Sequence, residues 1–152
     1  MTSFLTSFLV NASAEEMATF YTSVFPNSSI DSEFRAADGS MIVEHFTLDG
    51  LACNAINAGQ DFPFTSALST TVRCGSQAEV DHLWDGLTDG GTPGQCGWLT
   101  DRFGVSWQIV PEGMEQFVGD PNPARAAAAM NAMLAMSKLD LGLFAAAVEG
   151  VA

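Results

Sequence analysis

FLTSFLVNASAEEMATFYTSV (residues 4–24) and LSTTVRCGSQAEVDHLWDGL (residues 68–87) carry one pattern twice, and this repeat is the main evidence for the fold class. Each stretch begins with a strand-like apolar run and continues with helical periodicity. Ser13 and Ser76 fit helix N-caps, and Glu16 and Glu79 fit the third position of a capping box. A shift of 63 residues superposes the two caps. The same shift aligns two apolar helix faces: Met17, Phe20, Tyr21 and Val24 with Val80, Leu83, Trp84 and Leu87.

The rest of the chain extends this repeat into two modules of one strand, one helix and further strands. Turn signals at Asp38-Gly39 and Asp49-Gly50 separate the strands that follow the first helix. The predicted fold class is therefore α+β, with tandem βαβββ modules and a pseudo-symmetric groove between them as the place for a site. The first copy comprises a strand at 4–10, a helix at 14–25, and strands at 30–36, 41–48 and 51–57; the second comprises a strand at 67–73, a helix at 77–89, a loop at 90–94, and strands at 97–100 and 105–110.

We expect one domain over 1–152, made of a module at 1–60, a module at 66–112 and a C-terminal helical extension at 113–152. Asp120-Pro121-Asn122-Pro123 begins the first predicted helix of this extension, and Asp140 caps the second, which runs through Val148. Met130, Met133, Leu134 and Leu139 form an apolar set in the extension. They pack either on the chain's own sheet or on a second subunit, and both alternatives remain open.

Composition excludes several kinds of partner. Eighteen acidic residues against five basic ones give a net charge of −13, whereas nucleic acids and anionic membranes require a basic surface. Apolar residues make up 47% of the chain, but no apolar run reaches the roughly 18 residues of a membrane span.

The start of the sequence lacks a basic segment typical of a signal peptide. Three cysteines without CxxC spacing (Cys53, Cys74 and Cys96) suggest reduced thiols and a cytoplasmic location.

The segment GQCGWLTDRFGVSWQIVP (residues 94–111), with Phe20-Tyr21, Phe25-Pro26 and Asp120-Pro121-Asn122-Pro123, resembles a known family. It is similar to the PhnB-like branch of the vicinal oxygen chelate superfamily, which includes glyoxalase, dioxygenases and bleomycin-resistance proteins. Family profiles often label this branch 3-demethylubiquinone-9 3-methyltransferase. The resemblance implies the glyoxalase/bleomycin-resistance fold, a homodimer and a ligand site in the groove of a curved sheet.

Metal-using relatives take His, Glu or Gln ligands from strands of both modules. The resemblance places these positions near Thr6, at Asn54 or Asn57, at Ala67 or Ser69, and at Gln108. Only Gln108 is a plausible ligand among them, and one neutral amide cannot hold a transition metal. We therefore expect no metal and no other cofactor.

The two histidines and one carboxylate are further candidates. His82 falls outside the apolar face of its helix, which predicts an exposed side chain. His45 lies within a strand, where it is either a structural residue or part of a groove. Glu44 shares its strand face with Phe46 and Leu48, so it either pairs with Arg35 or Arg73 or acts as a general base.

Aromatic rings and amides in the family-like segment suit a small organic ligand, although each ring alone also fits a core. Cys96 is a weak candidate for a nucleophile, because Arg102 is the only base nearby in sequence. The candidate ligand-pocket residues are Gln108, Trp107, Trp98, Cys96, Gln95, Glu44, His45, Phe8 and Asn57; catalytic residues are not assigned.

Four functions follow, in order of preference. The first is a metal-free protein that binds a small organic molecule, with or without catalysis. The second is a metal-dependent lyase, isomerase or dioxygenase, and the third is a binding module that sequesters its ligand. Methyl transfer ranks last, because Gly90-Gly91 follows a helix, whereas a methyl-donor site usually has its glycine-rich turn between a strand and a helix.

Overall fold

The computed structural model describes residues 2–11 and 13–151, so the outermost residues of the predicted modules, 1 and 152, lie outside the described residues. The chain divides into two compact units, Met1–Pro63 (unit 1) and Phe64–Ala152 (unit 2). Within the described part, no helix is long and apolar enough to cross a bilayer.

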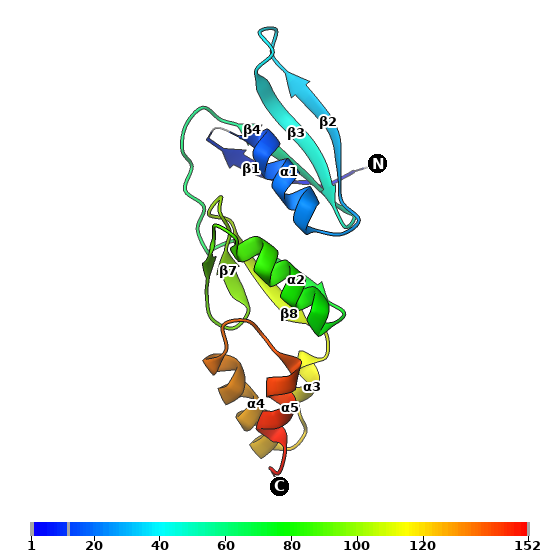
Figure 1. Ribbon diagram of the computed structural model, residues 1–152, viewed down its shortest axis with the longest axis vertical. Coiled ribbons are helices and arrows are strands. Elements are labelled where there is room, and N and C mark those ends of the chain that lie inside the picture. Colours follow the sequence, from blue (N-terminus) through cyan, green and yellow to red (C-terminus); the bar gives the residue numbers. More distant parts are fainter. Residues whose placement is uncertain (1, 12, 152) are drawn as a thin grey trace. The chain divides into compact units, whose positions relative to one another are not determined.

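Unit 1 is a four-stranded sheet with one helix on it (Figure 1). The strand order is β1-β4-β3-β2, with β1 parallel to β4 and the other neighbours antiparallel. These strands and the helix agree with the predicted first module. The elements are β1 (Thr6–Val10), α1 (Ala14–Val24), β2 (Ser29–Arg35), β3 (Met41–Leu48) and β4 (Leu51–Asn57).

The start of α1 is fixed by two side chains. Ser13 Oγ accepts a hydrogen bond from the backbone N–H of Glu16 at 2.9 Å, which confirms the predicted cap. Asn57 Oδ1 accepts from the N–H of Ala14, also at 2.9 Å.

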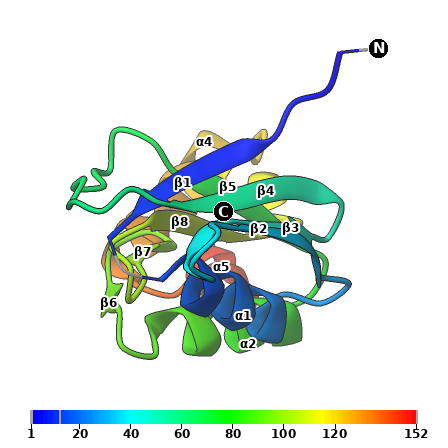
Figure 2. The ribbon, with the colours of Figure 1, turned by 90° about the horizontal axis from the view of Figure 1, so that it is seen from above.

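In the view of Figure 2, α1 lies below the strands of unit 1. The ring of Tyr21 in α1 contacts the rings of Phe8 and Phe46, so these two residues mark the face of the sheet that α1 covers.

Unit 2 repeats this arrangement and adds three helices (Figure 1). Its strand order is β5-β8-β7-β6, with β5 parallel to β8. Ser76 Oγ accepts from the N–H of Glu79 at 3.2 Å, so the second predicted cap is also confirmed. The elements are β5 (Thr70–Cys74), α2 (Gln77–Thr88), β6 (Thr92–Pro93), β7 (Trp98–Thr100), β8 (Ser106–Pro111), α3 (Met114–Val118), α4 (Pro123–Ala135) and α5 (Leu141–Val148).

Two short elements differ from the sequence prediction. The segment 90–94 was expected to be a loop throughout, but Thr92 and Pro93 pair with Thr100 and Leu99 as β6. The five-residue helix α3 was not predicted. Neither element is long enough to show a hydrophobic period, which is the signal that identified the others.

Helices α3, α4 and α5 form a small core of their own. Buried Met136, Leu139 and Phe144 lie at its centre, whereas Met130 and Leu134 are 39% and 59% exposed. The apolar set predicted in the extension is therefore divided between the chain's own core and its surface. Asp140 caps α5 as expected, and the structure shows that Asn122 caps α4.

The segment 136–139 after α4 joins this extension to the loop before β7. The N–H groups of Cys96 and Gly97 donate to the carbonyl oxygens of Met136 and Ser137, each at 2.8 Å. The hydroxyl of Ser137 donates to the carbonyl of Gly94. The extension therefore holds in place the loop that leads directly to Trp98.

Candidate functional site

Each sheet has one face covered by its unit's long helix and one face turned away from it. In β3 the buried residues Glu44, Phe46 and Leu48 alternate with the half-buried Val43, His45 and Thr47. Because Phe46 faces α1, alternation places Glu44 on the covered face and His45 on the other.

The face of the unit 1 sheet that points away from α1, called here the uncovered face, carries a line of polar side chains across three adjacent strands. Asn54 of β4 pairs in register with Ser7 of β1 on one side and with His45 of β3 on the other. We call Ser7, Asn54 and His45 polar row 1. The resemblance placed the first ligand position near Thr6, but Thr6 pairs with Cys53 and shares the parity of Phe8, so Ser7 is the β1 residue of the row.

Unit 2 has the equivalent line on its own sheet. Gln108 of β8 pairs with Thr71 of β5 and with Trp98 of β7. Trp98 and Gln108 are half-buried and alternate with the buried Leu99 and Trp107. Thr71, Gln108 and Trp98 form polar row 2. Both rows thus place a hydroxyl on the first strand of the unit, an amide on the last strand and an aromatic ring on the strand beside it.

The amides of the two rows differ in their hydrogen bonds. Gln108 Nε2 donates to Ser69 Oγ at 2.8 Å. Asn54 is 9% exposed, and its Oδ1 accepts no hydrogen bond from any described residue. At the edge of unit 1, Asp31 accepts from Thr47 and Ser29, and these two hydrogen bonds lower the pKa of its carboxyl.

Four predicted ligand-pocket residues lie on the covered faces. Phe8 packs against Tyr21, and Asn57 binds the start of α1. Trp107 is 1% exposed and donates its indole N–H to the buried Asp101 at 2.8 Å, which gives it a structural role in the core. Glu44, the fourth, is 4% exposed.

Glu44 does not form the expected ion pair. Arg35 pairs with Glu33 and Glu15 at the sheet edge, and Arg73 pairs with Glu115. No described residue donates a hydrogen bond to Glu44 Oε2. Burial, followed by repulsion from the charges of Glu33 and Glu15, raises the pKa of Glu44 above its ordinary value.

Two more predicted residues lie in the loop before β7. Gln95 is exposed, and Cys96 is half-buried with its Sγ donating to the carbonyl of Met133 at 3.5 Å. Arg102, the nearest base in sequence, pairs instead with Asp89. Burial raises the pKa of Cys53 and of Cys74 to about 11, so these thiols stay protonated at neutral pH. His82 is exposed, as predicted.

The residues present do not fit a transition-metal centre. The rows contribute hydroxyls, amides and one imidazole, whereas such a metal prefers several imidazole, thiolate or carboxylate ligands. Across residues 2–11 and 13–151, no three His, Cys, Asp or Glu side chains gather into a group that could hold an ion.

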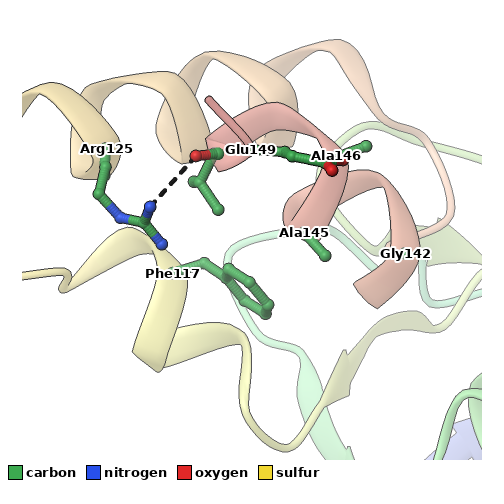
Figure 3. A pocket seen from close by; sticks show the side chains of 7 residues that line it. Phe117, Arg125, Gly142, Ala145, Ala146 and Glu149 are labelled. Carbon is green, nitrogen blue, oxygen red and sulfur yellow. Dashed lines mark hydrogen bonds between the residues drawn. The ribbon is translucent and has the colours of Figure 1, made fainter. Parts of the chain in front are cut away.

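A separate hollow of about 500 Å³ opens between the helices of the extension (Figure 3). Phe117 and the small residues of α5 form its walls, with Arg125 at one side. Arg125 pairs with Asp120 at 2.9 Å and donates to the carbonyl of Val148 at 3.3 Å, so its guanidinium already has protein partners.

Comparison with known proteins identifies the family. The family model described as 3-demethylubiquinone-9 3-methyltransferase matches residues 2–110. The chain belongs to this family. The matched residues include both polar rows, whereas α3, α4 and α5 lie beyond them. No curated protein matches the chain.

Solved structures agree with this assignment. A PhnB protein from Bacillus cereus, which carries the same methyltransferase name, is 31% identical, with a TM-score of 0.67 over 72% of this chain and 99% of that one. The protein PA1353 from Pseudomonas aeruginosa is 19% identical, with a TM-score of 0.60 over 74% and 98% of the two chains. The fosfomycin resistance protein FosX from Listeria monocytogenes, complexed with Mn(II) and sulfate, is 14% identical, with a TM-score of 0.55 over 71% and 89%.

These findings confirm the predicted fold class. This PhnB-like chain has the α+β glyoxalase/bleomycin-resistance fold of the vicinal oxygen chelate superfamily. At 14% identity, the likeness to FosX shows a similar fold and says nothing about function.

The polar rows contain three residues that sequence reasoning did not place among the ligand-pocket candidates: Ser7, Asn54 and Thr71. Asn54 had been considered only as a metal-ligand position. Strand register, which brings Asn54 beside His45, was the missing information. Of the nine predicted residues, His45, Trp98 and Gln108 belong to the rows.

Proposed function

We propose that this PhnB-like protein binds a small organic molecule at its polar rows without a metal ion. The observation that carries the proposal is the recurrence of hydroxyl, amide and ring at equivalent positions of both sheets. Amides and hydroxyls orient a ligand by hydrogen bonds, and the rings of Trp98 and His45 provide apolar contact area.

The available donors favour this function over metal chemistry. The two rows supply hydroxyls, amides and a single imidazole, whereas a transition metal prefers several imidazole, thiolate or carboxylate ligands. Methyl transfer is disfavoured because Gly90 and Gly91 lie between α2 and β6, after a helix and before a strand.

Tryptophan fluorescence tests the proposal. Trp84 and Trp107 are buried, so Trp98 is the indole that a ligand can reach. Purified protein is stripped with EDTA, checked by elemental analysis and titrated with a library of small aromatic and polar compounds. We expect saturable quenching that is lost in Trp98→Phe and weakened about tenfold in Gln108→Ala. Asn131→Ala, which changes an exposed amide of α4, serves as the matched control.

Other outcomes separate the alternatives. Binding that requires added zinc, nickel, manganese or iron would support the metal-dependent lyase, isomerase or dioxygenase and contradict the proposal. Tight binding without any turnover would identify a sequestering module rather than an enzyme. Titration with S-adenosylmethionine tests methyl transfer directly.

We also propose the homodimer that the family resemblance implies. The exposed Met130 and Leu134 of α4 are apolar side chains available for a contact between copies. Sedimentation equilibrium should give twice the chain mass of 16.0 kDa. A single-chain mass across the micromolar range would contradict this expectation.

A further inference from the structure

Polar row 1 contains a buried hydrogen-bond acceptor that the described protein leaves unused. Asn54 Oδ1 is inaccessible to solvent and accepts no hydrogen bond from a described residue. Buried side-chain oxygens nearly always have a partner, because leaving one without a donor costs free energy on folding. Such an atom on the uncovered face of a sheet is a feature of a site whose partner is a ligand.

The carboxamide of Asn54 carries a donor beside this acceptor, which restricts the ligand further. Its Nδ2 is an N–H donor on the same planar group as the unpartnered Oδ1, so a donor and an acceptor are presented side by side. In polar row 2 the corresponding nitrogen, Gln108 Nε2, is already bound to Ser69. An amide or lactam is the simplest group that offers one N–H and one C=O to match Asn54.

The surroundings of Asn54 favour a flat and uncharged molecule. His45 lies beside it on β3, and Leu9 and Ile56 share its face by alternation on β1 and β4. An imidazole and aliphatic side chains offer flat, apolar contacts. The net charge of −13 disfavours anionic ligands.

We propose that Asn54 pairs with the amide or lactam group of a flat, uncharged organic ligand that lies against His45. This inference rests on the proposed function and specifies the ligand class for polar row 1. It assigns Asn54 to binding, with its Oδ1 accepting the ligand N–H and its Nδ2 donating to the ligand C=O.

Three small probes test the inference on the full chain. Benzamide has the required N–H and C=O, N,N-dimethylbenzamide lacks the N–H, and benzoate is an anion of the same shape. Each is titrated into nitrogen-15-labelled protein, and the side-chain NH₂ resonances of Asn54 are followed by NMR. We expect benzamide to shift these resonances saturably and to bind about tenfold more tightly than either of the other two probes.

Two variants distinguish hydrogen bonding from shape. Asn54→Leu keeps the size of the side chain and Asn54→Ala opens space, so benzamide should lose about tenfold in affinity with both. Asn131→Leu, an exposed amide of α4, should bind benzamide as the parent does. Folding of each variant is checked by its NMR spectrum.

The remaining outcomes overturn the inference. Equal binding of benzamide and N,N-dimethylbenzamide would show that no N–H is recognised. Benzamide shifts confined to Trp98 and Gln108 would reject Asn54 as the binding residue and leave the proposed function in place. If none of the three probes moves the Asn54 resonances while the fluorescence titration finds ligands of another kind, the ligand class is wrong and the metal-free binding function stands.

Discussion

Glu44 is a buried carboxyl whose Oε2 accepts no hydrogen bond from any described residue, and its ionisation opposes folding. Its pKa is raised, chiefly by burial, so the folded chain holds this proton more tightly than the unfolded chain. Below the ordinary carboxyl pKa of about 4.5, Glu44 is protonated in both the folded and the unfolded chain and does not change the stability. Stability falls as the pH rises from this value through the raised pKa of the folded state. We expect Glu44→Gln to lack this loss, so that its stability relative to the parent, measured by urea unfolding, increases as the pH rises above about 4.5.

A second substitution at the same position separates charge from polarity. Glu44→Leu matches the apolar neighbours Phe46 and Leu48 and removes the unpaired Oε2. We expect it to raise the free energy of unfolding at pH 7 by about 1–3 kcal/mol. Parallel pH profiles for Glu44→Gln and the parent would show that Glu44 does not titrate differently in the folded state.

Asp101 binds three donors in a buried turn. Its Oδ1 accepts from the N–H groups of Phe103 and Val105 at 2.9 and 3.0 Å, and its Oδ2 accepts from Trp107 at 2.8 Å. Asp101→Ala leaves all three donors without this acceptor, and we expect a loss of at least about 3 kcal/mol in the free energy of unfolding. Chemical denaturation followed by tryptophan fluorescence measures it. Asp85→Ala, on the exposed side of α2, is the control and should change stability by less than about 0.5 kcal/mol.

At the level of the elements, the loop before β7 depends on close packing at Gly97. A Cβ there would come within 2.7 Å of the Ile109 carbonyl and 2.9 Å of Leu139 Cδ1, and φ is +82°. We expect Gly97→Ala to cost about 2–5 kcal/mol, from positive φ and overpacking together. Gly113, at φ +93° with nothing within 4 Å, isolates the backbone contribution, so Gly113→Ala should cost only about 1–2 kcal/mol.

Hydrogen exchange connects this packing to the extension. The N–H groups of Cys96 and Gly97 bond to the segment 136–139, and displacement of Leu139 by a new Cβ should weaken both bonds. We expect these two amides to exchange faster in Gly97→Ala than in Gly113→Ala. Equal exchange in the two variants would mean that the extension does not hold this loop.

The sequence predicted elements that have a period or a cap, and it failed where neither exists. Ser13 and Ser76 located two helices because an N-cap is a local signal. Alternation within β3 correctly separated Glu44 from His45, but it contains no information on the neighbouring strand. The pairing of Asn54 with both Ser7 and His45 depends on register between distant segments, so polar row 1 was not predictable as a unit. Glu44 was expected to have a partner on chemical grounds, and only the structure shows both candidate arginines bound elsewhere.

For the whole molecule, the division into two compact units predicts how the chain unfolds. Each unit has its own sheet, helix and buried side chains, and such units can open separately. The aromatic residues report on them independently. The single tyrosine, Tyr21, belongs to unit 1, and the three tryptophans, Trp84, Trp98 and Trp107, belong to unit 2.

We therefore expect two unfolding transitions when the NMR signals of the Tyr21 ring and the Trp107 indole N–H are followed with temperature. Glu44→Leu should raise the midpoint of the Tyr21 transition and leave that of Trp107 unchanged, because Glu44 lies in unit 1. Gly97→Ala should lower the Trp107 midpoint alone, because Gly97 lies in unit 2. If either substitution moves both midpoints equally, the two units unfold as one cooperative structure, and the stability of each sheet depends on the other.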